Sequence, residues 1–78
     1  MATRAYVLIE TLVGKTQDVL RAVSDIGGVK SADAVTGPYD IITAVEGIDL
    51  NAVGSLITNE VHTIEGIVRT TTCLAVDV

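Results

Sequence analysis

Cysteine and histidine are almost missing from this sequence of 78 residues, which contains one of each, Cys73 and His62. A single cysteine cannot form an intrachain disulfide, and one cysteine with one histidine cannot complete a four-ligand zinc site. Small domains leave a large share of their surface exposed, and they usually gain stability from disulfides, metals or oligomerisation. Because a single chain offers neither of the first two, we expect an oligomer without a metal or other cofactor.

Basic residues are also few and scattered, with five against ten acidic residues, so the formal net charge is −5. Phosphate contacts need clustered Lys and Arg, and this balance argues against direct binding of nucleic acid. The sequence lacks the run of roughly 18 apolar residues that a membrane span needs. Its first residues, M-A-T-R-A-Y-V, show no signal peptide. We therefore expect a cytoplasmic protein that contacts neither nucleic acid nor a membrane.

No catalytic motif is present. Neither the phosphate-binding pattern G-x-x-x-x-G-K-[ST] nor the metalloprotease pattern H-E-x-x-H occurs, and there is no second histidine to relay a proton. We expect His62 to interact with the C-terminal dipole of a helix, and Cys73 to act as a small hydrophobic residue of a strand. The chain is therefore not expected to be an enzyme.

What the sequence does contain is apolar surface and a clear periodicity. Hydrophobic residues make up 49% of the chain and the mean hydropathy is +0.53. This composition provides more apolar surface than one small core is expected to bury. Apolar spacing predicts strands at 3–12, 29–36, 40–46 and 67–78, and helices at 16–26 and 49–62. The order β-α-β-β-α-β predicts an α+β, ferredoxin-like fold, a four-stranded antiparallel sheet with both helices on one face. Because the face without helices carries apolar residues of the first strand, we expect a sheet-to-sheet dimer.

Local patterns specify further details. Thr16 and Asp49 are the expected N-caps, and Gly27-Gly28 is the expected end of the first helix. A close approach of the backbone to the sheet or to a neighbour would explain Gly54 inside the second helix. The apolar stripe of that helix is expected to comprise Leu50, Val53, Ile57 and Val61. Alternation in the last strand predicts one face with Val68, Thr70, Thr72, Leu74 and Val76, and another with Ile67, Arg69, Thr71, Cys73 and Ala75.

The turn T-G-P-Y-D, residues 36–40, is the most specific local feature. Gly37 permits backbone angles that other residues avoid, and Pro38 fixes its own φ, so a hairpin is expected here. Tyr39 stands beside the carboxylate of Asp40, which is suited to accept hydrogen bonds from a ligand's ammonium group. The alternative is that Tyr39 caps the core and Asp40 satisfies turn amides.

The last strand presents two hydroxyl groups, those of Thr70 and Thr72, on one face. They are candidate polar contacts for a ligand. Cross-strand pairing of threonines is the alternative.

Two runs resemble a known family. V-T-G-P-Y-D-I-I-T-A-V, residues 35–45, resembles the "v-x-G-x-[YF]-D" signature of the Lrp/AsnC transcription regulators, and I-E-G-I-V-R-T-T-T-C-L-A-V resembles that family's "l-x-G-V-x-x-T-x-T" strand. The resemblance covers essentially the whole chain and is to the C-terminal effector domain, called RAM for regulation of amino-acid metabolism. Residues 1–78 are expected to form one such domain, without the family's N-terminal helix-turn-helix domain.

The resemblance implies a function. Effector domains of this family dimerise through their sheets, the dimers form rings that are commonly octamers, and small effectors, usually amino acids, bind between dimers. When the family's motif positions are carried over to this sequence, the resemblance implies that the ligand-binding residues are Gly37, Tyr39, Asp40, Thr70 and Thr72. Amides near Gly37 would bind an α-carboxylate, Asp40 an α-ammonium, and Tyr39 would close over the side chain. We expect an amino-acid-sensing regulator, a homo-oligomer built as a tetramer of dimers, that acts by co-assembly with full-length Lrp/AsnC regulators.

Two alternatives stay open. One is a small dimeric ferredoxin-like enzyme, an isomerase or a cofactor-free monooxygenase, which would need a polar cluster buried inside one protomer. The other is a purely structural oligomerisation module, which would have a dry, filled interface in place of a cleft.

Overall fold

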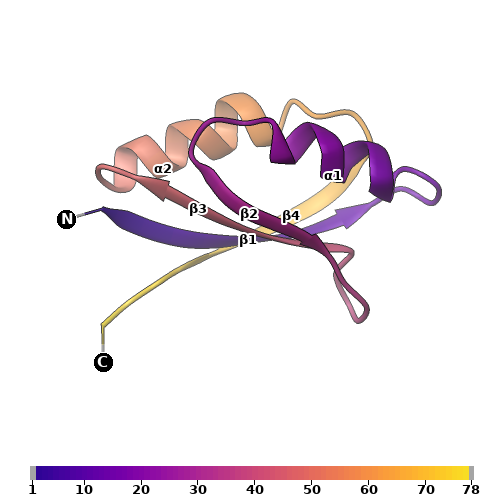
Figure 1. Ribbon diagram of the computed structural model, residues 1–78, viewed down its shortest axis with the longest axis horizontal. Coiled ribbons are helices and arrows are strands. Elements are labelled where there is room, and N and C mark those ends of the chain that lie inside the picture. Colours follow the sequence, from indigo (N-terminus) through magenta and orange to yellow (C-terminus); the bar gives the residue numbers. More distant parts are fainter. Residues whose placement is uncertain (1, 78) are drawn as a thin grey trace.

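The computed structural model describes residues 2–77, in which two helical segments lie over a twisted sheet (Figure 1). In chain order the elements are β1 (Thr3–Thr11), α1 (Thr16–Ser24), β2 (Val29–Ala34), β3 (Ile41–Gly47), α2 (Leu50–Leu56), the π-helix η1 (Ile57–Val61) that continues α2, and β4 (Ile67–Leu74). The predicted order of strands and helices is therefore confirmed. None of the helices in this described part is long and apolar enough to cross a membrane.

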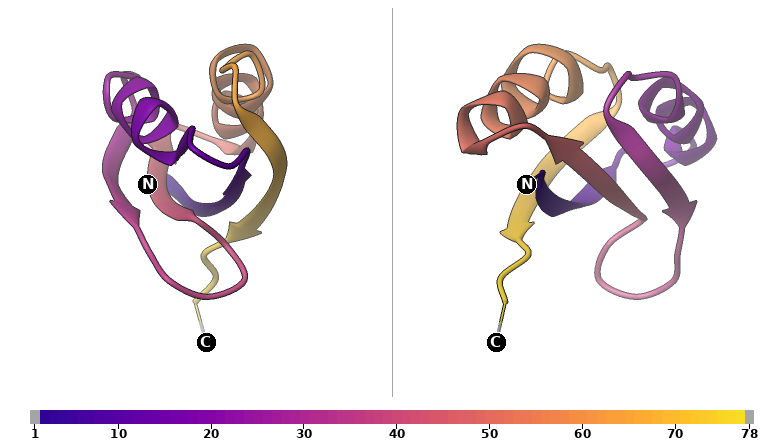
Figure 2. Two further views of the ribbon diagram at one scale, coloured as in Figure 1. Left: turned by 90° about the vertical axis from the view of Figure 1, so that its right-hand side faces the viewer. Right: turned by 60° about the vertical axis from the view of Figure 1, so that its left-hand side comes forward.

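The four strands form one antiparallel sheet in the order β2-β3-β1-β4. Ile9 of β1 lies opposite Ile41 of β3 on one side and opposite Thr70 of β4 on the other. Both helices cover the same face of this sheet, and no helix of the described part covers the opposite face (Figures 1 and 2). The predicted ferredoxin-like fold is confirmed, and the sheet-to-sheet dimer stays a prediction.

The core fills the layer between the helices and the sheet. Alternate residues of β1 and β3 point into it, as their period of two predicts. The helices contribute apolar residues at helical spacing from α1, α2 and η1. The buried apolar residues are Ala5, Val7, Ile9, Val19, Val23, Ile41, Val45, Val53, Ile57 and Val61. Amphipathic patterning therefore predicted most of this core.

The stripe of the second helix starts later than expected. Val53, Ile57 and Val61 are buried, but the prediction is wrong for Leu50, which is 57% exposed. Leu50 opens the helix directly after the sharp exit from β3, and contact with the sheet begins one turn later. A Cβ at Gly47 would lie 3.0 Å from the Ala52 Cβ, so glycine permits this tight exit.

One of the two predicted helix caps is confirmed. The Asp49 carboxylate accepts a hydrogen bond of 2.8 Å from the Ala52 N–H. The prediction for Thr16 is wrong, because Lys15 occupies the cap position without a side-chain bond. The Thr16 hydroxyl lies 2.7 Å from the Thr11 Oγ1 instead, so a contact across the β1–α1 connection replaces the cap. The first helix ends at Ser24, two residues before the predicted Ile26.

A bulge in β4 overturns the strict alternation predicted for this strand. Arg69 lies opposite Glu10 but Ile67 lies opposite Thr11, so Val68 is an extra residue. Ile67 therefore packs against the core, and Val68 is 56% exposed. The strand ends at Leu74, short of the predicted end, which lies outside the described residues.

The glycine inside α2 makes no close contact within the protomer. Beyond its chain neighbours and the backbone of its own helix, an added Cβ at Gly54 would meet no heavy atom of the described residues within 4 Å. The explanation that it approaches the sheet is therefore wrong, and contact with a neighbouring protomer stays a prediction.

Candidate functional site

The hairpin of residues 35–40 is closed by backbone hydrogen bonds. Val35 N–H donates to the Asp40 carbonyl oxygen at 2.9 Å, and Gly37 at the tip has a φ of +119°. That φ lies in the region that favours glycine, as the turn sequence predicted. Asp40 N–H donates to the Ile9 carbonyl oxygen at 2.8 Å, which fixes the base of the hairpin against the end of β1.

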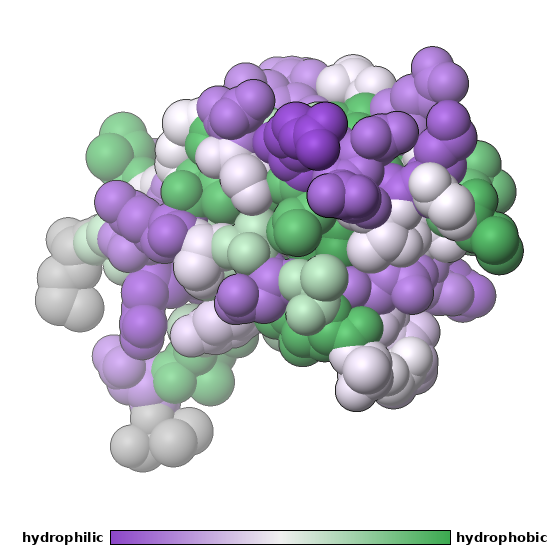
Figure 3. All heavy atoms as spheres, turned by 45° about the vertical axis from the view of Figure 1, so that its right-hand side comes forward, coloured by the Kyte–Doolittle hydropathy of each residue, from purple (hydrophilic) through white to green (hydrophobic). Residues whose placement is uncertain are grey.

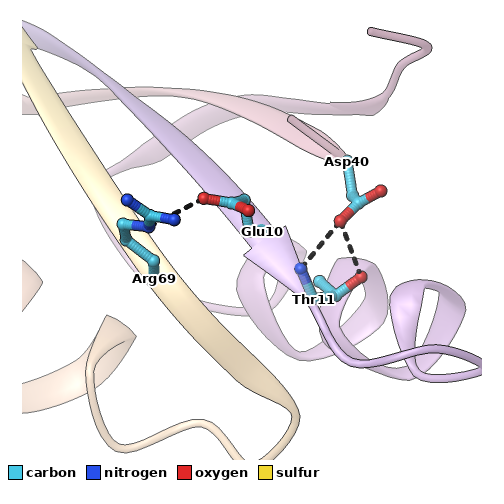
Figure 4. Close-up of polar contacts among 4 residues, drawn as sticks. All are labelled: Glu10, Thr11, Asp40 and Arg69. Atoms are coloured by element: carbon cyan, nitrogen blue, oxygen red, sulfur yellow. Dashed lines mark hydrogen bonds and ion pairs between the residues drawn. The ribbon is translucent and has the colours of Figure 1, made fainter. Parts of the chain in front are cut away.

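The Asp40 carboxylate contacts the end of β1. Its Oδ2 accepts a hydrogen bond of 2.8 Å from the Thr11 N–H and one of 3.3 Å from the Thr11 hydroxyl (Figure 4). Since the Thr11 hydroxyl donates to Asp40, the Thr16 hydroxyl is left to donate to Thr11. The chain Asp40–Thr11–Thr16 therefore ties the hairpin, β1 and the start of α1 together. The alternative, that Asp40 satisfies amides of its own turn, does not account for this contact, because the partner residue Thr11 lies 29 positions away.

The carboxylate keeps hydrogen-bonding capacity after these contacts. All of its hydrogen bonds to residues 2–77 go to Oδ2, and within that range the one ion pair is between Arg69 and Glu10, at 2.9 Å (Figure 4). Asp40 is half-buried, Tyr39 beside it is half-buried and outside the core cluster, and Gly37 is exposed. A carboxylate with one oxygen outside these hydrogen bonds, a half-buried tyrosine and an exposed glycine therefore lie together at the hairpin.

The two threonines of β4 lie on the helix-covered face of the sheet, near its edge. Thr70 is opposite Ile9 and Thr72 is opposite Val7, so the alternative of cross-strand threonine pairing is wrong within the protomer. Thr70 is half-buried and Thr72 is exposed. The Thr70 Oγ1 lies 3.0 Å from the Nε2 of His62, which caps the C-terminal end of η1.

Strand β1 separates these threonines from the hairpin. Asp40 binds the backbone of Ile9 from the β3 side, and Thr70 pairs with the same residue from the β4 side. Neighbouring strands are about 4.8 Å apart, so the two backbones are about 10 Å apart. The structure thus brings Gly37, Tyr39 and Asp40 together, and it places Thr70 and Thr72 in a second group across β1.

Sequence reasoning missed Thr11 and Thr16 as partners of Asp40 and His62 as a partner of Thr70. No local pattern could have found the first contact, because it depends on strand pairing. His62 was expected at the end of a helix, and it does lie there, but its hydrogen bond to Thr70 depends on how the connector 63–66 folds back. Residues 2–77 contain no group of three or more His, Cys, Asp or Glu side chains placed to hold a metal ion.

The face of the sheet opposite the helices carries partly exposed apolar side chains. Tyr6 is 40% exposed and Ile42 38% exposed, and Leu8 and Ala44 between them are half-buried. Cys73 is exposed on this face opposite Tyr6. Figure 3 shows apolar patches between hydrophilic side chains on the side of the molecule that it displays.

The sequence matches a family model described as the Lrp/AsnC ligand binding domain over residues 4–78. A protein of Thermus thermophilus, TTHA0845, has a similar structure, with a TM-score of 0.92, 30% identity, and coverage of 97% of this chain and 95% of that one. The hypothetical protein PHS023 of Pyrococcus horikoshii gives a TM-score of 0.89 at 32% identity, with 97% and 90% of the two chains covered. No curated protein sequence matches the chain.

A third similar structure contains a ligand. The transcriptional regulator NMB0573 of Neisseria meningitidis was solved as a complex with L-Met, and it gives a TM-score of 0.85 at 16% identity. The match covers 96% of this chain and 50% of that one, so this chain spans half of that regulator. At this identity the likeness concerns the fold alone.

Proposed function

The chain belongs to the Lrp/AsnC ligand-binding domain family, and from this membership we propose that it senses a free amino acid or a closely related metabolite. The family is one of regulatory ligand-binding domains, so the chain is a regulatory domain and the enzyme alternative is set aside.

The Asp40 carboxylate is the observation that carries the proposal. Two hydrogen bonds from Thr11 hold it in place, and no Lys or Arg in the described part of the chain forms an ion pair with it. A preorganised carboxylate with a free oxygen suits an ammonium group, because charge-assisted hydrogen bonds are stronger than neutral ones. The exposed backbone at Gly37 would receive the α-carboxylate, and the Tyr39 ring would cover the side chain of the effector.

We place the complete site between protomers. Because β1 separates Asp40 from Thr70 in one protomer, an amino acid that contacts both groups needs Thr70 and Thr72 from a neighbouring copy. The apolar open face of the sheet would form the dimer, and dimers would join into a ring through the hairpin and β4. The same contacts would allow co-assembly with full-length regulators of the family.

A structural neighbour supports the ligand class. The Neisseria meningitidis regulator, which has this fold over the matched half of its length, was solved with L-Met bound. An L-amino acid is therefore the first class of effector to test.

Thermal-shift measurements with each of the twenty amino acids test the proposal, with light scattering to follow the size of the assembly. A ligand at 100 times its Kd adds about 2.7 kcal/mol to the free energy of unfolding, which gives an easily measured shift. Titration calorimetry would then give the Kd of each hit.

The matched variants are Asp40→Asn and Asp25→Asn. Asp40→Asn keeps an oxygen that accepts from the Thr11 N–H but removes the charge, so affinity should fall about 10- to 100-fold, the range expected for one charge-assisted bond. Asp25 is exposed at the end of α1, and its amide variant should bind like the wild type. A stable assembly that no amino acid shifts would contradict the sensor proposal and favour the purely structural module.

A further inference from the structure

The segment after α2 is irregular. Helix α2 continues as a π-helix over Ile57–Val61, in which the His62 N–H donates to the Ile57 carbonyl oxygen at 2.9 Å. π-Helical turns are rare and occur frequently at functional sites. The Thr63 hydroxyl donates to the carbonyl oxygens of Asn59 and Glu60, at 3.2 and 3.1 Å, and so satisfies groups at the end of the wide turn.

This wide turn brings His62 to the sheet edge beside Thr70. The 3.0 Å separation of Nε2 and Oγ1 is that of a hydrogen bond, and its direction depends on the tautomer of the imidazole. His62 is exposed and Thr70 is half-buried, so the bond adds little to stability. Its clearer effect is on orientation, because a bond to the imidazole sets the direction in which the Thr70 O–H points.

The pair is polar and can both donate and accept hydrogen bonds. Thr72, which is exposed, adds a second hydroxyl two residues along the same strand face. An apolar ligand side chain placed against these groups would deprive them of water without giving a hydrogen bond in return, which is unfavourable. A side chain with an oxygen acceptor would replace the lost water.

We propose that His62 positions the Thr70 hydroxyl in the effector site, and that the two residues together select an effector whose side chain ends in a carboxylate or a carboxamide. This proposal rests on the proposed function, because it takes Thr70 as part of that site. His62 is a positioning residue that acts through Thr70, and Asp40 holds the α-ammonium group on the other side of the cleft.

The test compares isosteric effectors in titration calorimetry: Asn with Leu, and Gln with Met. The wild type should prefer the amide member of a pair. Thr70→Val and His62→Ala should each reduce that preference at least tenfold, and neither should weaken binding of the apolar member, because fewer polar groups are then deprived of water. His62→Gln retains a donor and an acceptor at the end of its side chain and should restore most of the preference. The double variant should be no worse than either single variant, because the residues act as one unit.

Controls separate this effect from a loss of structure. Thr58→Val makes the same change at an exposed threonine of η1, outside the proposed site and interfaces, and should leave the preference unchanged. Light scattering should give the wild-type assembly size for every variant compared.

Three results would overturn the proposal. A wild type that binds the apolar member of each pair more tightly overturns the selectivity and leaves the sensor function intact. Binding that is weakened in Asp40→Asn but unchanged in strength and selectivity in His62→Ala and Thr70→Val overturns the roles of both His62 and Thr70 and leaves the role of Asp40 intact. The absence of binding by any amino acid overturns this proposal together with the proposed function.

Discussion

Thr43 is a buried polar residue in the centre of β3, and it should limit stability. Its side chain faces the core between Ile41 and Val45 and is 0% exposed. The hydroxyl oxygen has no hydrogen-bond partner among residues 2–77. Burial of a hydroxyl group without a partner costs about 1–3 kcal/mol, judged from protein mutants.

Thr43→Val should therefore raise the free energy of unfolding by about 1–2 kcal/mol. Valine has nearly the shape of threonine and is equally suited to a strand, so the change replaces the hydroxyl with a methyl group and leaves packing intact. For a domain of this size, 1 kcal/mol corresponds to about 4–8 °C in Tm. The variant should melt several degrees above the wild type.

Calorimetry and urea denaturation would measure the difference in stability between Thr43→Val and the wild type. Both proteins are compared at one fixed concentration without effector, because assembly and ligand both shift the Tm. Thr43→Ser keeps the hydroxyl but removes a buried methyl group, and it should be about 1 kcal/mol less stable than the wild type. The same Thr→Val change at exposed Thr58 should alter the free energy of unfolding by no more than about 0.5 kcal/mol. A Thr43→Val variant no more stable than the wild type would refute the reasoning, since the hydroxyl would then have a partner such as a buried water molecule.

Two further predictions concern the assembly. Ile42→Lys puts a charge in the open face of the sheet and should lower the particle mass in light scattering below that of the wild type, whereas Leu50→Lys, at an exposed leucine of α2, should not. A wild-type mass for Ile42→Lys would show that this face is not the dimer interface. Gly54→Ala should raise the free energy of unfolding by up to about 1 kcal/mol, because alanine favours the helix and its Cβ, beyond its chain neighbours and the backbone of its own helix, meets no heavy atom of the described residues within 4 Å. A loss of stability or a smaller assembly in Gly54→Ala would instead show that this face of α2 contacts a neighbouring protomer.

The fold could be predicted from periodicity, because several residues of each strand or helix show the same apolar spacing. The alternation of Ala5, Val7 and Ile9 and the helical spacing of Val53, Ile57 and Val61 both reflect one buried face. Features that involve one residue lacked such repetition. The bulge at Val68 depends on how β4 pairs with β1, and the exposure of Leu50 depends on where the helix first meets the sheet.

The candidate site was predictable in part for the same reason. Residues Gly37, Tyr39 and Asp40 are consecutive or nearly so, and a hairpin must bring them together. The partner of Asp40 was not predictable, because Thr11 lies 29 positions earlier and reaches it only through the sheet. That contact changes how a variant should be interpreted: Asp40→Ala would leave the Thr11 N–H without an acceptor and lower stability as well as affinity, whereas Asp40→Asn isolates the charge.

The position of β1 has a consequence for regulation under the proposed function. An effector that contacts Asp40 of one protomer and Thr70 of another binds the assembled form and not the separate protomers. By linkage, effector then stabilises the assembly by the same free energy by which assembly strengthens effector binding. Because the hairpin and β4 are proposed to join dimers, loss of the dimer in Ile42→Lys leaves each of these contacts without the support of the closed ring. Ile42→Lys should therefore weaken effector binding although Asp40, Thr70 and His62 are all intact, and a saturating effector should partly restore the contact between hairpin and β4. A monomeric Ile42→Lys protein that binds the effector with wild-type affinity would contradict this coupling and would place the whole site within one protomer.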